Sequence, residues 1–73
     1  MKLKVGDHLF EPLSGNSGEI TKMIHHPDGK LVTVRWQVDG HLAHESEHFY
    51  NKLKKCIQRG EMEHKSCSGD PAP

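Results

Sequence analysis

The segment that most constrains the fold of this chain is residues 31–38, where apolar and polar side chains alternate strictly from Val32 onward. Successive side chains of a strand point to opposite faces of its sheet, so this period of two predicts a β-strand with one buried face and one solvent-exposed face. We expect Trp36 and its valine neighbours to lie in the core. Asp39-Gly40 is typical of a two-residue hairpin turn, and residues 41–45 are expected to return as a strand with Leu42 pointing inward.

Two further strands are expected before this segment. The first covers residues 8–11 and ends at Pro12, which has no N–H to donate to a ladder. Residues 14–18 are an uninterrupted run of turn-forming residues, which predicts a loop. The second strand is expected over residues 19–25, with Ile20 and Ile24 on one face.

After residue 46 the spacing of the apolar residues changes from every second residue to the spacing of one face of a helix. The apolar stripe of this predicted helix consists of Phe49, Leu53, Cys56 and Ile57. Ser46 is the expected N-cap and Gly60 the expected stop. The chain beyond Gly60 is polar and rich in Ser and Pro, so we expect one domain over residues 1–60 and a disordered tail over residues 61–73.

Composition limits the classes of protein to which this chain can belong. Its 73 residues allow one small domain, and ten basic residues balance ten acidic ones. A neutral chain is poorly suited to a function based mainly on phosphate neutralisation. No stretch approaches the roughly 18 apolar residues that would span a membrane. Two cysteines are few for a disulfide scaffold, so we expect a cytoplasmic protein with reduced thiols.

Seven histidines raise the question of a metal site. The candidate ligands are His41, His44, His48, Cys56, His64 and Cys67. The chain has no Cys-x-x-Cys pair, and the spacing of His41 and His44 places them on opposite faces of one strand. Cys56 lies on the apolar stripe, where a cysteine is usually a small buried hydrophobe rather than a nucleophile. We therefore expect no metal, no cofactor and no catalytic residues.

A basic helix face is the first candidate for partner binding. Lys52, Lys55 and Arg59 lie at i, i+3 and i+7, which places them on one side of the predicted helix. The alternative interpretation of this face is a solvated surface without a partner. Asn16 and Ser17, in the expected loop 14–18, form the second candidate.

The first part of the chain resembles a known group of domains. Val5-Gly6-Asp7-His8-Leu9 followed by Gly15-x-x-Gly18-x-Ile20 is similar to the opening of the KOW and Tudor group of SH3-like barrels, over about residues 5–45. This resemblance implies a small antiparallel barrel with RNA, a ribosome or RNA polymerase as partner. In size and overall make-up the chain also resembles the small RNA-polymerase-binding transcription regulators of Xanthomonas phages. That likeness implies binding to the host polymerase, inhibition of initiation and help with antitermination.

These observations together predict a mainly β protein, a small SH3-like antiparallel barrel with one short C-terminal helix. We expect a monomeric, non-enzymatic transcription regulator that binds RNA polymerase, acting in the host cytoplasm if phage-encoded. The neutral charge places protein recognition ahead of nucleic-acid recognition. The alternative is a KOW-like module that binds nucleic acid or the ribosome.

Overall fold

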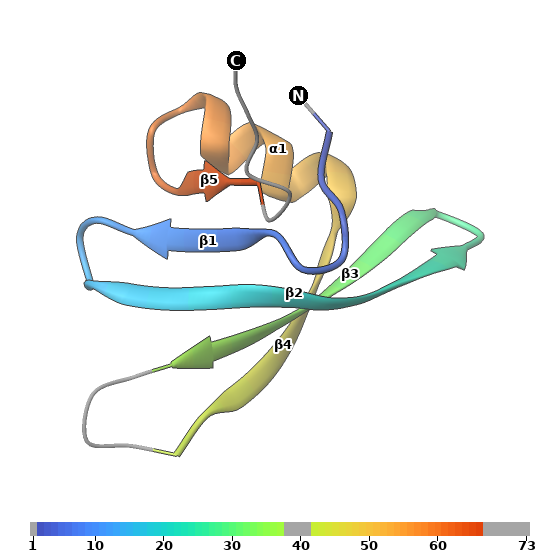
Figure 1. Ribbon diagram of the computed structural model, residues 1–73. Coiled ribbons are helices and arrows are strands. Elements are labelled where there is room, and N and C mark those ends of the chain that lie inside the picture. Colours follow the sequence, from blue (N-terminus) through green and yellow to red (C-terminus); the bar gives the residue numbers. More distant parts are fainter. Residues whose placement is uncertain (1, 38–41, 67–73) are drawn as a thin grey trace.

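The protein is mainly β, as expected, and its described residues form five antiparallel strands in one sheet and one short helix. The computed structural model describes residues 2–37 and 42–66. The elements are β1 (His8–Glu11), β2 (Asn16–His26), β3 (Gly29–Gln37), β4 (His44–Phe49), α1 (Tyr50–Gln58) and β5 (Glu63–Lys65). The strand order is β4-β3-β2-β1-β5, so the first four strands form a meander and β5 returns to the free edge of β1 (Figure 1).

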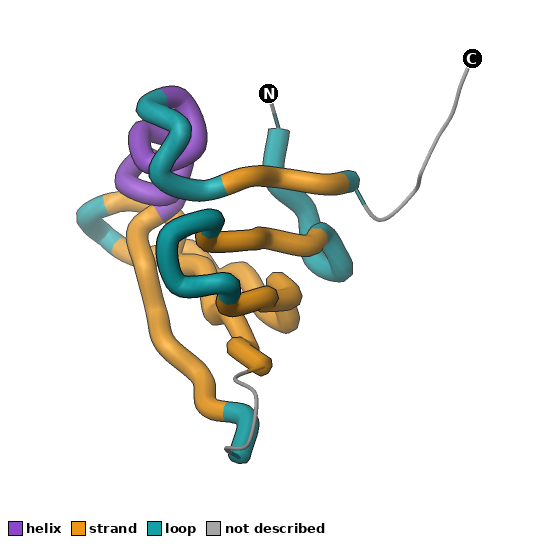
Figure 2. Tube along the Cα trace, turned by 90° about the vertical axis from the view of Figure 1, so that its left-hand side faces the viewer, coloured by secondary structure: helices purple, strands orange, loops and turns teal. Residues whose placement is uncertain are grey.

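The core lies between the curved sheet and α1, which contacts β3 and β4 (Figures 1 and 2). Its buried side chains are Leu3, Leu9, Ile20, Val32, Val34, Trp36, Leu53 and Met62. Trp36 is only 5% exposed, which confirms the core position predicted from the alternation in β3. Because α1 supplies Leu53 to this core, the helix is held against the sheet by apolar burial.

A register shift in β2 changes which side chains reach the core. Ile20 lies opposite Val34, but the pairing shifts between Ile20 and Lys22, and Met23 then lies opposite Val32. An extra residue in one strand reverses the alternation beyond it. The prediction that Ile20 and Ile24 share one face is therefore wrong: Ile20 is fully buried, and Ile24 is 44% exposed.

The turn before β2 is shorter than the sequence predicted. β2 begins at Asn16, so only the start of the expected loop 14–18 is a turn, with Gly15 at a φ of 77°. Gly18 lies inside the sheet, where an added Cβ would be 2.7 Å from the Trp36 ring. Gly18 is thus needed for close packing against Trp36 rather than for a loop.

The passage from β4 to α1 also differs from expectation. Ser46 lies within β4 instead of capping the helix, and α1 begins at Tyr50. Pairing with β3 keeps the chain extended up to Phe49, which lies opposite Leu31 and is 37% exposed instead of buried. Leu42 is 92% exposed, so its predicted inward position is wrong. The predicted turn at Asp39-Gly40 lies outside the described residues.

The first part of the expected disordered tail is folded. After Gly60, which has a φ of 81°, the chain reverses and buries Met62 to 6% exposure. β5 then pairs with β1, with Lys65 opposite His8. The predicted boundary at residue 61 is therefore wrong for residues 61–66, and residues 67–73 lie outside the described part of the chain.

Candidate functional site

The three cations predicted on one helix face come together around one hollow. This basic hollow is lined by Phe49, Asn51, Lys52, Lys55, Cys56, Arg59 and Glu61. Lys52, Lys55 and Arg59 are all exposed, and residues 50–58 contain no acidic side chain. Like charges gathered on a low-dielectric surface create a local positive potential. The basic hollow is therefore suited to an anionic partner.

The basic hollow also contains apolar surface and one acidic side chain. Phe49 is 37% exposed there, and Cys56 is half-buried against the core. Arg59 Nη1 lies 4.0 Å from Glu61 Oε2, but both side chains are exposed. Exposed ion pairs of this kind contribute little, so Glu61 leaves Arg59 able to turn toward a partner.

Tyr50 fixes the start of α1, and with it the basic hollow. Its hydroxyl accepts a hydrogen bond from the Leu3 backbone N–H at 3.0 Å. The ammonium groups of Lys30 and Lys54 lie 5.0 and 5.7 Å from the centre of its ring, within the range of cation–π attraction. The helix is therefore held between the N-terminal segment and the sheet, and its cations project from a fixed support.

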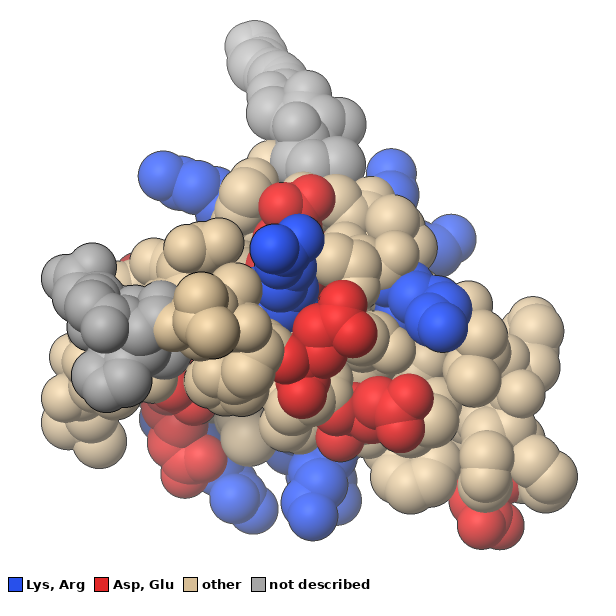
Figure 3. All heavy atoms as spheres, turned by 90° about the horizontal axis from the view of Figure 1, so that it is seen from below, with Lys and Arg blue, Asp and Glu red and all other residues tan. Residues whose placement is uncertain are grey.

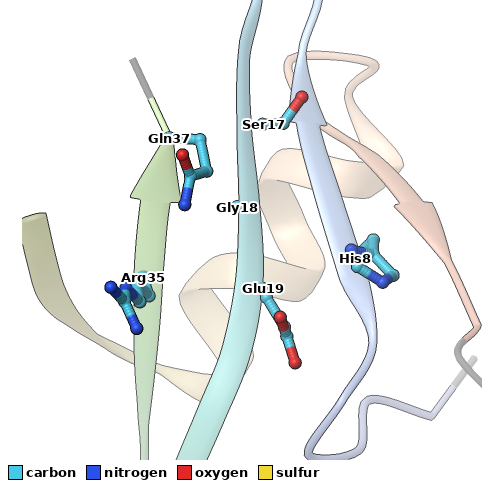
Figure 4. Close-up of a pocket in the computed structure, with 6 residues that line it drawn as sticks. All are labelled: His8, Ser17, Gly18, Glu19, Arg35 and Gln37. Carbon is cyan, nitrogen blue, oxygen red and sulfur yellow. The ribbon is translucent and has the colours of Figure 1, made fainter. Parts of the chain in front are cut away.

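The second predicted pair, Asn16 and Ser17, does not join the basic hollow. Ser17 lines a separate hollow over β1, β2 and β3, and Figure 4 shows α1 behind these strands. Its lining residues are His8, Ser17, Gly18, Glu19, Arg35 and Gln37. Asn16 occupies the opposite strand position, and its Nδ2 lies 3.5 Å from Glu11 Oε1. Neighbouring strand residues point to opposite faces, so one binding surface cannot use both side chains equally.

The charges on the sheet face are balanced. Glu19 lies opposite Arg35 on β3, and Arg35 lies opposite Glu45 on β4. Figure 3 shows acidic and basic side chains side by side on the face seen from below. This face therefore lacks the positive potential that characterises the surface of α1.

A chain of hydrogen bonds joins β3 to β4 beside the core. The Trp36 indole N–H donates to Ser46 Oγ at 2.8 Å, and this oxygen lies 2.7 Å from His48 Nε2. Burial lowers the pKa of His48 below its ordinary value of 6.5, partly opposed by Glu11, while Lys52 lowers it further. His48 is therefore neutral at pH 7, and the Ser46 hydroxyl is engaged with the core tryptophan.

The buried pair of Asp7 and His64 was missed by the sequence analysis. The Asp7 side chain is 1% exposed, and its Oδ2 lies 2.7 Å from His64 Nε2. The same oxygen accepts the Lys4 backbone N–H at 3.0 Å. The turn at Val5-Gly6-Asp7 could be recognised locally, but the partner of Asp7 is 57 residues away along the chain. Asp7 thus joins the N-terminal turn to β5.

No metal centre is found within residues 2–37 and 42–66, where no group of three or more His, Cys, Asp or Glu is arranged to hold an ion. Of the candidate ligands, His41 and Cys67 lie outside the described residues. No helix in the described part of the chain has the length and apolar character needed to cross a membrane.

Comparison with known proteins gave no relative. No protein-family model, no curated protein and no solved structure matches this chain.

Proposed function

We propose that this protein is a non-enzymatic transcription regulator that docks on RNA polymerase through its basic hollow. One observation carries the proposal: Lys52, Lys55 and Arg59 line one hollow together with the partly exposed Phe49. Protein interfaces commonly combine an aromatic or arginine anchor with a charged rim. The transcriptional role follows from the resemblance to RNA-polymerase-binding phage regulators, which inhibit initiation and assist antitermination.

A protein partner fits the charge distribution better than a nucleic acid. The whole chain is neutral, and the sheet face mixes both signs of charge. Affinity for nucleic acid increases with the number of phosphates neutralised, and the basic hollow offers only three cations beside Glu61. The meander with a fifth strand returning to β1 supports the resemblance to SH3-like barrels, whose partners include proteins of the transcription machinery.

Charge reversal tests the proposal. A variant with Lys52, Lys55 and Arg59 all changed to Glu should capture purified bacterial RNA polymerase at least tenfold more weakly, a loss of about 1.4 kcal/mol. The control reverses Lys2, Lys4 and Lys22, which are exposed and lie outside the basic hollow. It makes the same change in net charge and should bind like the parent protein.

Two results would overturn this proposal. Equal capture by the parent and the variant with the reversed hollow would remove α1 from the interface. Retention of RNA or DNA, with a steep loss on adding salt and no polymerase captured, would instead assign the protein to the nucleic-acid or ribosome-binding class.

A further inference from the structure

The basic hollow shares Phe49 with an apolar row on the sheet. Ile24 lies opposite Leu31, and Leu31 lies opposite Phe49, so these three side chains form one line across β2, β3 and β4. Ile24 is 44% exposed and Phe49 is 37% exposed. The ring of His26 lies edge-on to Phe49 with ring centres 5.5 Å apart. Phe49 belongs to both the row and the basic hollow, so apolar and cationic surfaces meet at this residue.

The combination of surfaces restricts the chemistry of the occupant. A phosphate backbone would use the cations but leave the apolar row exposed, and a purely apolar segment would leave the cations without partners. An acidic peptide segment with one bulky apolar side chain uses both surfaces. Its charge also complements the helix surface, where Lys52, Lys54, Lys55 and Arg59 outnumber Glu61.

We propose that the basic hollow and the apolar row together bind an acidic segment of the partner through one leucine-like or aromatic side chain packed against Phe49 and Cys56. This inference rests on the proposed function and identifies the kind of epitope that the polymerase presents. The apolar side chain covers Phe49 and extends toward Leu31, while carboxylates on either side of it meet Lys52, Lys55 and Arg59.

The two parts of the surface have separable effects on binding. Rim charges mainly set the association rate and its dependence on salt, whereas a packed apolar anchor mainly sets the dissociation rate. Replacing the lysines should therefore slow association. Removing the Phe49 ring should speed dissociation while leaving the salt dependence unchanged.

Peptide binding tests the inference directly. The probe is a synthetic peptide with one leucine flanked on both sides by glutamates, titrated into the isotopically labelled full chain and followed by amide NMR shifts. The matched peptide has serine in place of leucine. We expect the leucine peptide to bind at least tenfold more tightly and to shift the amides of Phe49, Cys56 and Leu31.

Two protein variants complete the test. Phe49→Ala should weaken binding of the leucine peptide at least tenfold, whereas Phe10→Ala should leave it unchanged. Phe10 is a fair control because it is 38% exposed, close to the 37% of Phe49, and lies on β1, outside the residues that line the basic hollow. If Phe49→Ala fails to fold, Ile24→Ser removes apolar surface from the same row and should still weaken binding.

The outcomes separate this inference from the proposed function. Equal affinity for the leucine and serine peptides, or unchanged binding by the Phe49 and Ile24 variants, would overturn the apolar anchor even if the charged rim still captured polymerase. A single-stranded oligonucleotide that displaced the leucine peptide from the hollow would also overturn it. Leucine-dependent binding without capture of polymerase would support the epitope and refute the polymerase as partner.

Discussion

The contact between His64 and Asp7 joins the end of the described chain to its beginning, and its removal tests how β5 is held. In His64→Ala the carboxylate of Asp7, whose side chain is 1% exposed, loses a hydrogen-bond partner at 2.7 Å. The Lys4 backbone N–H remains as a partner of Asp7. We expect the variant to be clearly destabilised, with the loss greatest at β5.

The size of the effect follows from the burial of the pair. Leaving a buried hydrogen-bonding group without its partner costs about 1–3 kcal/mol, and more when the group is charged. The His64 side chain is 14% exposed, so water can partly replace it, and we expect a cost of about 2–3 kcal/mol. At roughly 0.05–0.15 kcal/mol per residue, a chain of this length has about 4–11 kcal/mol of stability in total. The variant should therefore still fold, but with a much smaller free energy of unfolding.

Urea unfolding followed by fluorescence of Trp36, the single tryptophan, measures this loss. The matched control is His8→Ala, because His8 is an exposed histidine that lies opposite Lys65 in the same strand pair. An exposed substitution of this kind should change stability by less than about 0.5 kcal/mol. Hydrogen exchange should show faster exchange of the β5 amides in His64→Ala alone.

A double-mutant cycle isolates the pair from the rest of the core. Asp7→Asn keeps an oxygen that can accept the Lys4 N–H, and in that background His64→Ala should cost at least about 1 kcal/mol less than in the parent. The reasoning is refuted if His64→Ala is as stable as His8→Ala, or if the cost of losing His64 is the same in both backgrounds.

Three shorter predictions concern the core, pH and the chain end. Gly18→Ala should lower stability by about 1–3 kcal/mol, because its Cβ would be 2.7 Å from the Trp36 ring; an unchanged thermal midpoint would contradict this. The pKa of His48 is lowered in the folded state, so stability present above pH 6.5 should fall as pH drops through the folded pKa. Urea midpoints of His48→Gln should depend less on pH over that interval, and parallel curves for variant and parent would disprove the assignment. Truncation after Gly60 should cost at least about 2–5 kcal/mol through loss of Met62 alone, and an unaltered urea midpoint would show that β5 is dispensable.

The basic face of α1 was predictable because helical spacing is a local property. Lys52, Lys55 and Arg59 lie on one side of any regular helix with this sequence, and the structure places all three around one hollow. The position of Phe49 in the basic hollow was not predictable, since it depends on the pairing of β4 with Leu31 in β3. The placement of the Asn16 and Ser17 side chains on opposite faces of a strand likewise depends on where β2 begins.

By itself, the sequence determined the features carried by short-range periodicity: the alternating strand β3 with Trp36 in the core, the stripe around Leu53, and the mainly β class. Tertiary structure alone decided the register shift after Ile20, the folding of β5 and the pairing of Asp7 with His64. Side-chain period is a property of neighbouring residues and can be read along the chain. Register and buried polar pairing instead depend on which distant segments meet, because each is set by the free energy of packing the whole domain.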